Sequence, residues 1–344
     1  MRTDQKTHTR SFAILGLLLL LTAFANIHLG SIHIPSGDIA SILTGHPSAD
    51  KSWDYIVLNY RIPKAITAIL VGSGLGISGL LMQTLFRNPL AGPFVLGISS
   101  GASLGVAFLL LGASLFGGVF AGLAQQSWSI ALAASLGSFF VLGAVLLVVK
   151  KIRNTLSILI VGLMFGSISA AVINVLSYFS NAEQLQQFVF WSLGSLGNLS
   201  WKELALFSGI VAFSTVLLLR SIKPLDSLLL GENYAQSMGV ALKKTRRILV
   251  ISTGLLTGVI TAFAGPIAFV GLAVPHLTKL IFNTSSHKIL LPAVALNGAL
   301  LLLVCDAIAQ LPNSELTLPI NAITSLFGAP IVIWLLVRKQ KINV

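Results

Sequence analysis

The most informative stretch of the sequence is residues 61–102, which read RIPKAITAILVGSGLGISGLLMQTLFRNPLAGPFVLGISSGA. No side chain between Lys64 and Arg87 is charged, and about 20 predominantly apolar residues are enough for a helix to cross a bilayer. Asn88-Pro89 then ends the run, because proline has no amide hydrogen and clashes with the preceding helical turn. The stretch therefore predicts two membrane-spanning helices joined by a sharp turn.

The remainder of the chain has the same character. Of its 344 residues, 55% are hydrophobic and 9% are charged, whereas about 25% of residues are charged in a typical soluble domain. So few charges cannot cover the surface of a water-soluble protein of this size, which excludes that class. The single cysteine, Cys305, lies in an apolar run, so we expect neither an intramolecular disulfide nor a metal or redox site.

Apolar stretches of spanning length recur along the whole sequence. They begin near Phe12, Ala65, Phe94, Trp128, Leu156, Trp201, Ile248, Ile267, Leu290 and Ile320. The long run from residue 248 to residue 282 is divided at Gly265-Pro266, a dipeptide that breaks helices. The sequence therefore predicts an all-α integral membrane protein with ten transmembrane helices.

The basic residues predict the orientation of these helices. If the N-terminus is cytoplasmic, all of the 22 Lys and Arg residues except Lys51, Arg61, Lys64 and Lys202 lie on the cytoplasmic side. Such a bias is typical of inner-membrane proteins and places both termini in the cytoplasm. The net charge of +12 is then explained by contact with anionic membrane lipid, so we expect no nucleic-acid partner.

The first span has an alternative interpretation. Arg10, the apolar residues 11–21 and the small residues of Ala23-Phe24-Ala25 resemble a cleavable signal peptide. We favour a retained helix, because the apolar character continues through Ile27 toward a length that can span the bilayer.

Two short motifs suggest enzymes, but neither has the required context. Residues 74–79 match the dinucleotide motif GxGxxG, yet they lie inside an apolar helix, where small residues favour close helix packing. Ser99 and Ser103 match GxSxG, and His276 is a conceivable base for an intramembrane hydrolase. A nucleophilic serine in that motif requires a strand-to-helix turn, so we favour helix packing here too.

Asp306 is the only acidic residue within an apolar span. An acid in the membrane is a candidate for a proton relay, and a proton-coupled secondary carrier is therefore an alternative function. Such a carrier usually has several intramembrane acids, so we favour a structural ion pair or cap near the outer interface.

Two blocks of sequence resemble the FecCD family, the permeases of ATP-driven, binding-protein-dependent importers for iron-siderophores, haem and cobalamin. The first block comprises Arg61-Ile62-Pro63-Lys64, the glycines of residues 72–79, Gln83, Arg87-Asn88-Pro89-Leu90-Ala91, Pro93 and residues 96–102. The second comprises residues 264–272 with Gly265-Pro266, Val274-Pro275-His276, Leu291-Pro292, Gly298-Ala299, Asp306 and residues 328–330. The resemblance implies a single permease domain over residues 1–344, inverted-repeat halves formed by helices two to five and seven to ten, and a type II homodimer.

Residues 220–247 form the longest predicted cytoplasmic segment. Its short helical patches, separated by Gly231 and Gly239, suit a protein contact, although a helix lying on lipid is an alternative. The resemblance implies coupling helices that dock on a cytoplasmic ABC ATPase, two copies of which would bind ATP and Mg²⁺. The candidate coupling residues are Leu229, Gly231, Glu232, Tyr234, Ala235, Met238 and Gly239. The sequence has no P-loop, so we expect no enzymatic activity and no cofactor in this chain.

Other site residues follow from the resemblance. Arg61 and Lys64 stand where the family's cations pair with acidic residues of an external substrate-binding protein, although interfacial anchoring is an alternative. The family often has arginine at Lys64 and at Gln310. Candidate pathway residues are Asn154, Thr155, Ser157, Asn174, Phe188 and Trp191. The expected cargo is a ferric siderophore, the family's commonest, with cobalamin or haem as alternatives.

Overall fold

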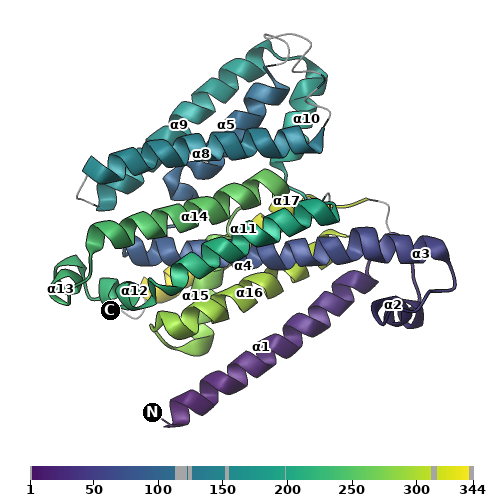
Figure 1. Cartoon of the computed structure of the whole chain (residues 1–344), viewed down its shortest axis with the longest axis horizontal. Helices are drawn as coiled ribbons and strands as arrows, with labels where there is room; N and C mark the ends of the chain where they lie inside the picture. Colours follow the sequence, from purple (N-terminus) through teal and green to yellow (C-terminus); the bar gives the residue numbers. More distant parts are fainter. Residues whose placement is uncertain are drawn as a thin grey trace. The chain divides into compact units, whose positions relative to one another are not determined.

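The computed structural model describes residues 2–112, 122, 126–151, 155–197, 199–310 and 316–340. All regular elements of these residues are helical, and they contain no β-strand. The long helices are α1 (Arg2–His28), α4 (Ile62–Leu85), α8 (Ser127–Lys151), α9 (Thr155–Phe179), α11 (Trp201–Leu219), α14 (Leu242–Ala264), α16 (His287–Ala309) and α17 (Ile320–Gln340) (Figure 1). The shorter elements are α2 (Ser36–Leu43), α3 (Lys51–Ile56), the π-helix η1 (Val57–Arg61), the 3₁₀-helix η2 (Pro93–Leu96), α5 (Ile98–Leu110), α10 (Ala182–Ser192), α12 (Ile222–Leu229), α13 (Glu232–Ser237) and α15 (Val270–Phe282).

The helices confirm a multi-pass membrane protein. In the described part of the chain, seven helices are long and apolar enough to cross a bilayer. Three shorter apolar segments, α5, α15 and residues Ile320–Trp334 of α17, follow the other predicted starts. The positions of the apolar segments are therefore as predicted, while the number of spans remains a prediction.

The chain forms two compact units. Unit 1 comprises Met1–Gly76, Ser195–Ser208 and Ala268–Val344, and unit 2 comprises Ile77–Gly194 and Gly209–Ile267.

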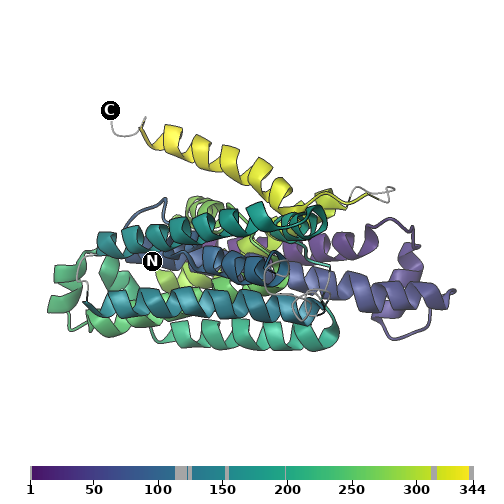
Figure 2. The same cartoon turned by 90° about the horizontal axis from the view of Figure 1, so that it is seen from above.

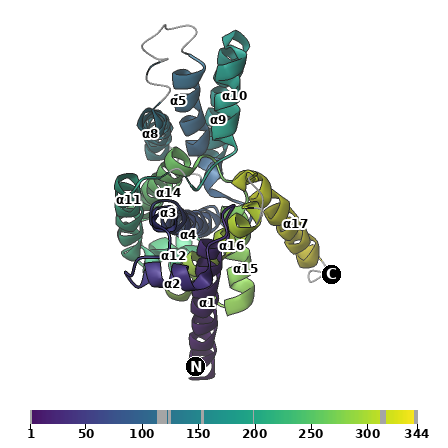
Figure 3. The same cartoon turned by 90° about the vertical axis from the view of Figure 1, so that its right-hand side faces the viewer.

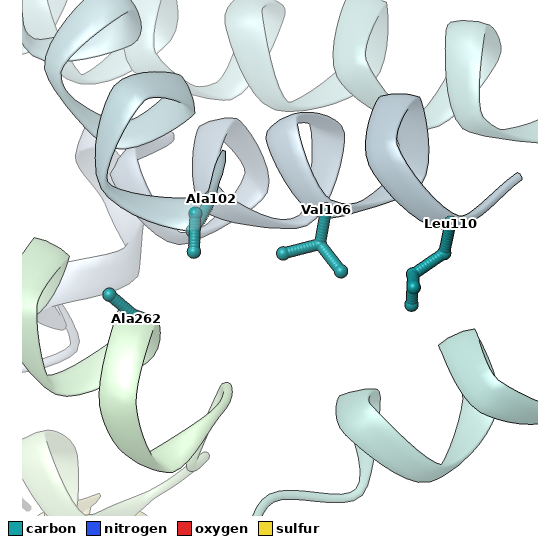
Figure 4. Packing of buried hydrophobic residues seen from close by; sticks show 5 residues of the cluster. Ala102, Val106, Leu110 and Ala262 are labelled. Atoms are coloured by element: carbon teal, nitrogen blue, oxygen red, sulfur yellow. The ribbon is translucent and has the colours of Figure 1, made fainter. Parts of the chain in front are cut away.

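In unit 2, α5 packs against α8, α9 and α14. Ala102, Val106 and Leu110 of α5 and Ala262 of α14 belong to one buried core cluster (Figure 4). The helices approach closely because small residues face each other: a Cβ on Gly101 would lie 2.6 Å from the carbonyl oxygen of Gly137.

In unit 1, α16 packs against α1, α15 and α17. Figures 2 and 3 show α17 diverging from α15 and α16 toward its C-terminal end. The backbones of α4 and α16 touch, since a Cβ on Gly72 would lie 2.1 Å from the carbonyl oxygen of Gly298. Gly76, within the GxGxxG match, also lies close to α16: a Cβ there would be 3.0 Å from the Cγ1 of Val294. These contacts support the helix-packing interpretation of that motif.

The order of elements repeats along the chain. Helices α4, α5, α8 and α9 have 24, 13, 25 and 25 residues, and α14, α15, α16 and α17 have 23, 13, 23 and 21. In both sets a Gly-Pro turn precedes the 13-residue helix. This repetition agrees with two related halves, and their inversion remains a prediction.

Candidate functional site

The segment of α12 and α13 presents apolar side chains to its surroundings. Leu225 and Leu228 of α12 are buried, whereas Leu229 and Leu230 are exposed. Tyr234 is 54% exposed and Met238 is 59% exposed. We call these four exposed residues, Leu229, Leu230, Tyr234 and Met238, the α12–α13 surface.

Other residues predicted for coupling hold this segment in place. The carboxylate of Glu232 forms an ion pair with Arg246 of α14, and Ala235 is fully buried. Gly231 and Gly239 have positive φ angles of 112° and 83°, which glycine adopts without a Cβ penalty. The prediction that Ala235 forms part of the contact surface is therefore corrected, because it is buried. Glu232 stays a predicted contact residue, since 34% of its side chain is exposed beside the ion pair.

Leu230 is the exposed residue that the sequence reasoning missed, at 63% exposure. The sequence contained a signal for this exposure. Leu225 and Leu228 have the i, i+3 spacing of one buried helical face. Leu229 and Leu230 come directly after these two residues and lie outside that spacing, at the end of the helix.

The motif Arg87-Asn88-Pro89 lies beside this segment. The guanidinium of Arg87 is 3.6 Å from the position that a Cβ on Gly231 would occupy. Asn88 shapes its own turn, since its Oδ1 accepts a hydrogen bond from the amide of Leu90. The turn after α4 and the linker between α12 and α13 are thus neighbours within unit 2.

A second polar site lies within unit 1, around Asp306 of α16. Its Oδ1 lies 3.1 Å from the Nζ of Lys64 on α4. Its Oδ2 accepts hydrogen bonds from the side-chain amides of Asn26 on α1 and Gln310, each at 2.9 Å. Asp306 therefore has the structural ion pair that we favoured over a proton relay.

Arg61 is buried, contrary to its expected docking role. Its guanidinium donates hydrogen bonds to the carbonyl oxygens of Ile27, His28 and Ile32. A buried cation with three carbonyl acceptors is held by the fold, because moving the guanidinium away would leave buried carbonyl groups without hydrogen-bond partners. Arg61 thus fastens the end of α1 to η1 and is not available to an external protein in this structure.

The predicted pathway residues lie in several environments. Phe188 and Trp191 of α10 pack together against the α5 and α14 core, with ring centroids 6.1 Å apart. Both side chains are only partly buried, so their place along the pathway stays a prediction. Asn174 is exposed on α9 and Ser157 is partly buried. Asn154 lies outside the described residues, and so does the side chain of Thr155.

The second motif block also shapes the backbone. Gly265 has φ of 74°, and a Cβ there would lie 2.8 Å from the carbonyl oxygen of Trp191. Pro266 follows at the turn, and Pro275 is buried inside α15. His276 bonds through Nδ1 to the Leu272 carbonyl oxygen at 2.9 Å. These residues shape the turn after α14 and the interior of α15.

The enzyme motifs gain no support from the geometry. Ser99 and Ser103 both lie on α5, and Ser99 shares a hydrogen bond of 3.2 Å with Thr261. No strand precedes them in the described ranges, so the hydrolase elbow is not formed. Within those ranges, no three His, Cys, Asp or Glu side chains are grouped to hold a metal ion.

Comparisons with known proteins give the sequence relatives. The chain is 36% identical over 338 residues to the vitamin B12 import system permease protein BtuC of Klebsiella pneumoniae subsp. pneumoniae, covering 98% of this chain and 96% of the relative. BtuC of Salmonella arizonae is 34% identical over 341 residues, covering 99% and 98%.

Solved structures of similar fold include an ABC transporter. A metal-chelate type ABC transporter in an inward-facing conformation superposes with a TM-score of 0.80 at 28% identity, covering 96% of this chain and 99% of that one. PsaBC from Streptococcus pneumoniae shares the fold, with a TM-score of 0.52 at 17% identity, covering 86% and 94%. Residues 18–338 match the model of the FecCD transport family. The chain belongs to the FecCD transport family and is a permease subunit of an ABC importer.

Proposed function

We propose that this permease imports cobalamin, as a homodimer with two ATP-hydrolysing subunits and an external binding protein. The observation that supports this choice of cargo is the 36% identity to a permease named for vitamin B12 import, which extends over 98% of the chain. It favours the cobalamin alternative over the ferric siderophore expected from the family's commonest use. A ferric chelate is the second candidate, because the metal-chelate type transporter is 28% identical and covers 96% of this chain.

The α12–α13 surface is the proposed contact for the ATPase. Three leucine-sized or larger apolar side chains and a tyrosine stand exposed on two short helices, a shape that suits insertion into a groove of a partner. Basic residues on both sides of the segment place it in the cytoplasm under the positive-inside rule. They include Arg220, Lys223, Lys243, Lys244 and Arg247.

The same rule places both termini in the cytoplasm and the Lys64–Asp306 end on the outer side of a bacterial inner membrane. ATP and Mg²⁺ bind the partner subunit, since this sequence has no P-loop to hold phosphates. Closure of two ATPases on ATP would then move the docked segments and alternate the access of the pathway.

Uptake measurements test the cargo and the energy source together. Cells that lack their own system would express the permease with its ATPase and binding protein, and receive labelled cobalamin, ferric siderophore or haem. A parallel culture would carry an ATPase that cannot hydrolyse ATP. We expect cobalamin uptake that vanishes in this culture. Uptake of iron alone would replace the cargo, and uptake that survives but needs a proton gradient would overturn the ABC mechanism.

The coupling surface has a matched control. Tyr234→Ser removes a tyrosine from the α12–α13 surface, whereas Tyr55→Ser removes an equally exposed tyrosine of α3. We expect Tyr234→Ser to weaken co-purification with the ATPase by about tenfold, as for an aromatic residue at the centre of an interface, and Tyr55→Ser to leave it unchanged. Equal effects of both variants would argue against this surface as the contact.

A further inference from the structure

We propose that the Lys64–Asp306 ion pair is a latch, and that a carboxylate of the docking external protein opens it by taking Lys64 away from Asp306. The proposal rests on the proposed function, because it requires an external binding protein. It adds a regulatory step to docking, in which one cation exchanges an internal partner for an external one.

The two members of the pair differ in accessibility. The side chain of Lys64 is 23% exposed, whereas that of Asp306 is 3% exposed. An incoming protein can therefore reach part of the Lys64 side chain, whereas the carboxylate of Asp306 is enclosed. Arg61, the other expected docking cation, is held by three backbone carbonyl oxygens. Of this pair of cations, Lys64 is the one free to exchange partners.

The surroundings of Asp306 make the exchange feasible. Removing one member of a buried ion pair usually costs several kcal/mol, because the other charge is left uncompensated. Here the second carboxylate oxygen already accepts hydrogen bonds from Asn26 and Gln310. These neutral donors would stabilise the carboxylate after Lys64 has left, so release is costly but not prohibitive.

The latch joins three helices at one end of unit 1. Lys64 lies on α4, Asp306 and Gln310 lie on α16, and Asn26 lies on α1. Asn26 also donates a hydrogen bond to the carbonyl oxygen of Leu303, which ties α1 to α16. Opening the ion pair therefore loosens α4 while α1 and α16 remain joined.

A second contact between α4 and α16 provides the pivot. Gly72 and Gly298 touch backbone to backbone, eight residues along each helix from Lys64 and Asp306. Eight residues of α-helix span about 12 Å, so the latch lies about two turns from this contact. With the latch open, the latch ends of the two helices can separate about the glycine contact.

Purified complexes of permease and ATPase in lipid nanodiscs test the latch against the purified binding protein. Asp306→Asn keeps the shape of the side chain and removes the charge that holds Lys64. We expect about fivefold tighter binding of the external protein and a raised ATPase rate in its absence, since Lys64 and α4 are already released. Unchanged affinity and unchanged unstimulated rate would overturn the proposal.

Variants at Lys64 give the opposite expectation. Lys64→Gln should weaken binding by about fivefold and reduce stimulation of the ATPase, and Lys64→Arg should preserve both. Lys202→Gln, which removes an exposed cation at the start of α11, is the control and should change neither. If Lys64→Gln binds as the wild type does, Lys64 does not dock and the proposal fails.

A charge swap protects the test against unfolding of the single variants. The double variant Lys64→Asp with Asp306→Lys keeps an ion pair but puts an acid at the accessible position. We expect assembly with the ATPase, measured by size-exclusion chromatography, together with loss of binding to the external protein. Normal binding by the swapped protein would show that docking does not need a cation at residue 64, and it would overturn the proposal. Failure of the proposed function can be told apart from failure of the latch, because in the first case the binding protein would not stimulate the wild-type complex at all.

Discussion

The two short helices that follow the Gly-Pro turns begin with the same backbone conformation, but they contact the neighbouring helix differently. We call the contact at the start of each short helix its seat. In unit 2, α5 starts after Gly97, which has φ of 71°, and in unit 1, α15 starts after Phe269, which has φ of 64°. Each start lies against a glycine of the last helix in its set, Gly162 of α9 or Gly328 of α17. The first seat is thus backbone on backbone, and the second is a phenylalanine on a glycine.

This difference indicates which seat is under strain. A left-handed backbone costs an L-residue with a Cβ about 1–2 kcal/mol, and Phe269 carries this cost whereas Gly97 does not. Phe269 is held by its neighbours: Asn321 of α17 accepts a hydrogen bond of 3.0 Å from the amide of Ala268. The α5 seat is therefore the rigid one, and the α15 seat depends on side chains that can rearrange.

The largest effect is expected at the rigid seat. A Cβ added by Gly162→Ala would lie 2.1 Å from the carbonyl oxygen of Val95 and 2.8 Å from the Cα of Leu96. Neither backbone atom can turn away, so we expect a loss of about 3 kcal/mol of stability. Thermal unfolding in detergent measures it, with Gly209→Ala as the control, where no atom lies within 4 Å of the added Cβ. Equal melting temperatures would show that α9 can move away from η2, the turn that precedes α5.

At the second seat, the expected effect is smaller and can be rescued. Gly328→Ala places a Cβ 2.3 Å from the Cβ of Phe269, and we expect a loss of about 2 kcal/mol. In a Phe269→Gly background the same substitution should cost little, because the clashing side chain is gone. A double-mutant cycle of melting temperatures measures this coupling. Additive effects would mean that Gly328 and Phe269 do not touch.

Much of the fold could be predicted because its signals are local. Hydropathy indicated the apolar helices, and Asn88-Pro89 and Gly265-Pro266 indicated the turns, because proline and glycine act on their own few residues. The α12–α13 segment was predicted in the same way, from glycines that punctuate short amphipathic patches.

The rest of the site depends on distant contacts that local patterns do not reveal. Arg61 has the position of a docking cation, but its carbonyl partners come from the end of α1 and the loop beyond it. Asp306 could be predicted to need a partner, yet Asn26 comes from near the other end of the chain. Phe269 gave no signal, because phenylalanine is not a residue that favours a left-handed backbone.

Asn321 provides a test of what supports the strained seat. Asn321→Ala leaves the amide of Ala268 without its acceptor, and Ala268 is only partly buried. We expect a loss of about 1 kcal/mol, the net value of a typical hydrogen bond. Thermal unfolding measures it, and Asn321→Asp, which retains the acceptor oxygen, should lose less. If both variants lose the same amount, the hydrogen bond is not what holds Ala268.

The smallest effect isolates the backbone strain itself. Phe269→Ala and Phe269→Gly both remove the ring, and they differ only in the Cβ that disfavours the left-handed conformation. Glycine is normally the less stable choice because it is more flexible in the unfolded chain, so a higher melting temperature for glycine here reports the strain. We expect glycine to be more stable by about 0.5 kcal/mol, which is the left-handed penalty less the usual cost of glycine's flexibility. A more stable alanine variant would mean that residue 269 is not held left-handed in the protein, and the two seats would then differ only in the size of the side chain.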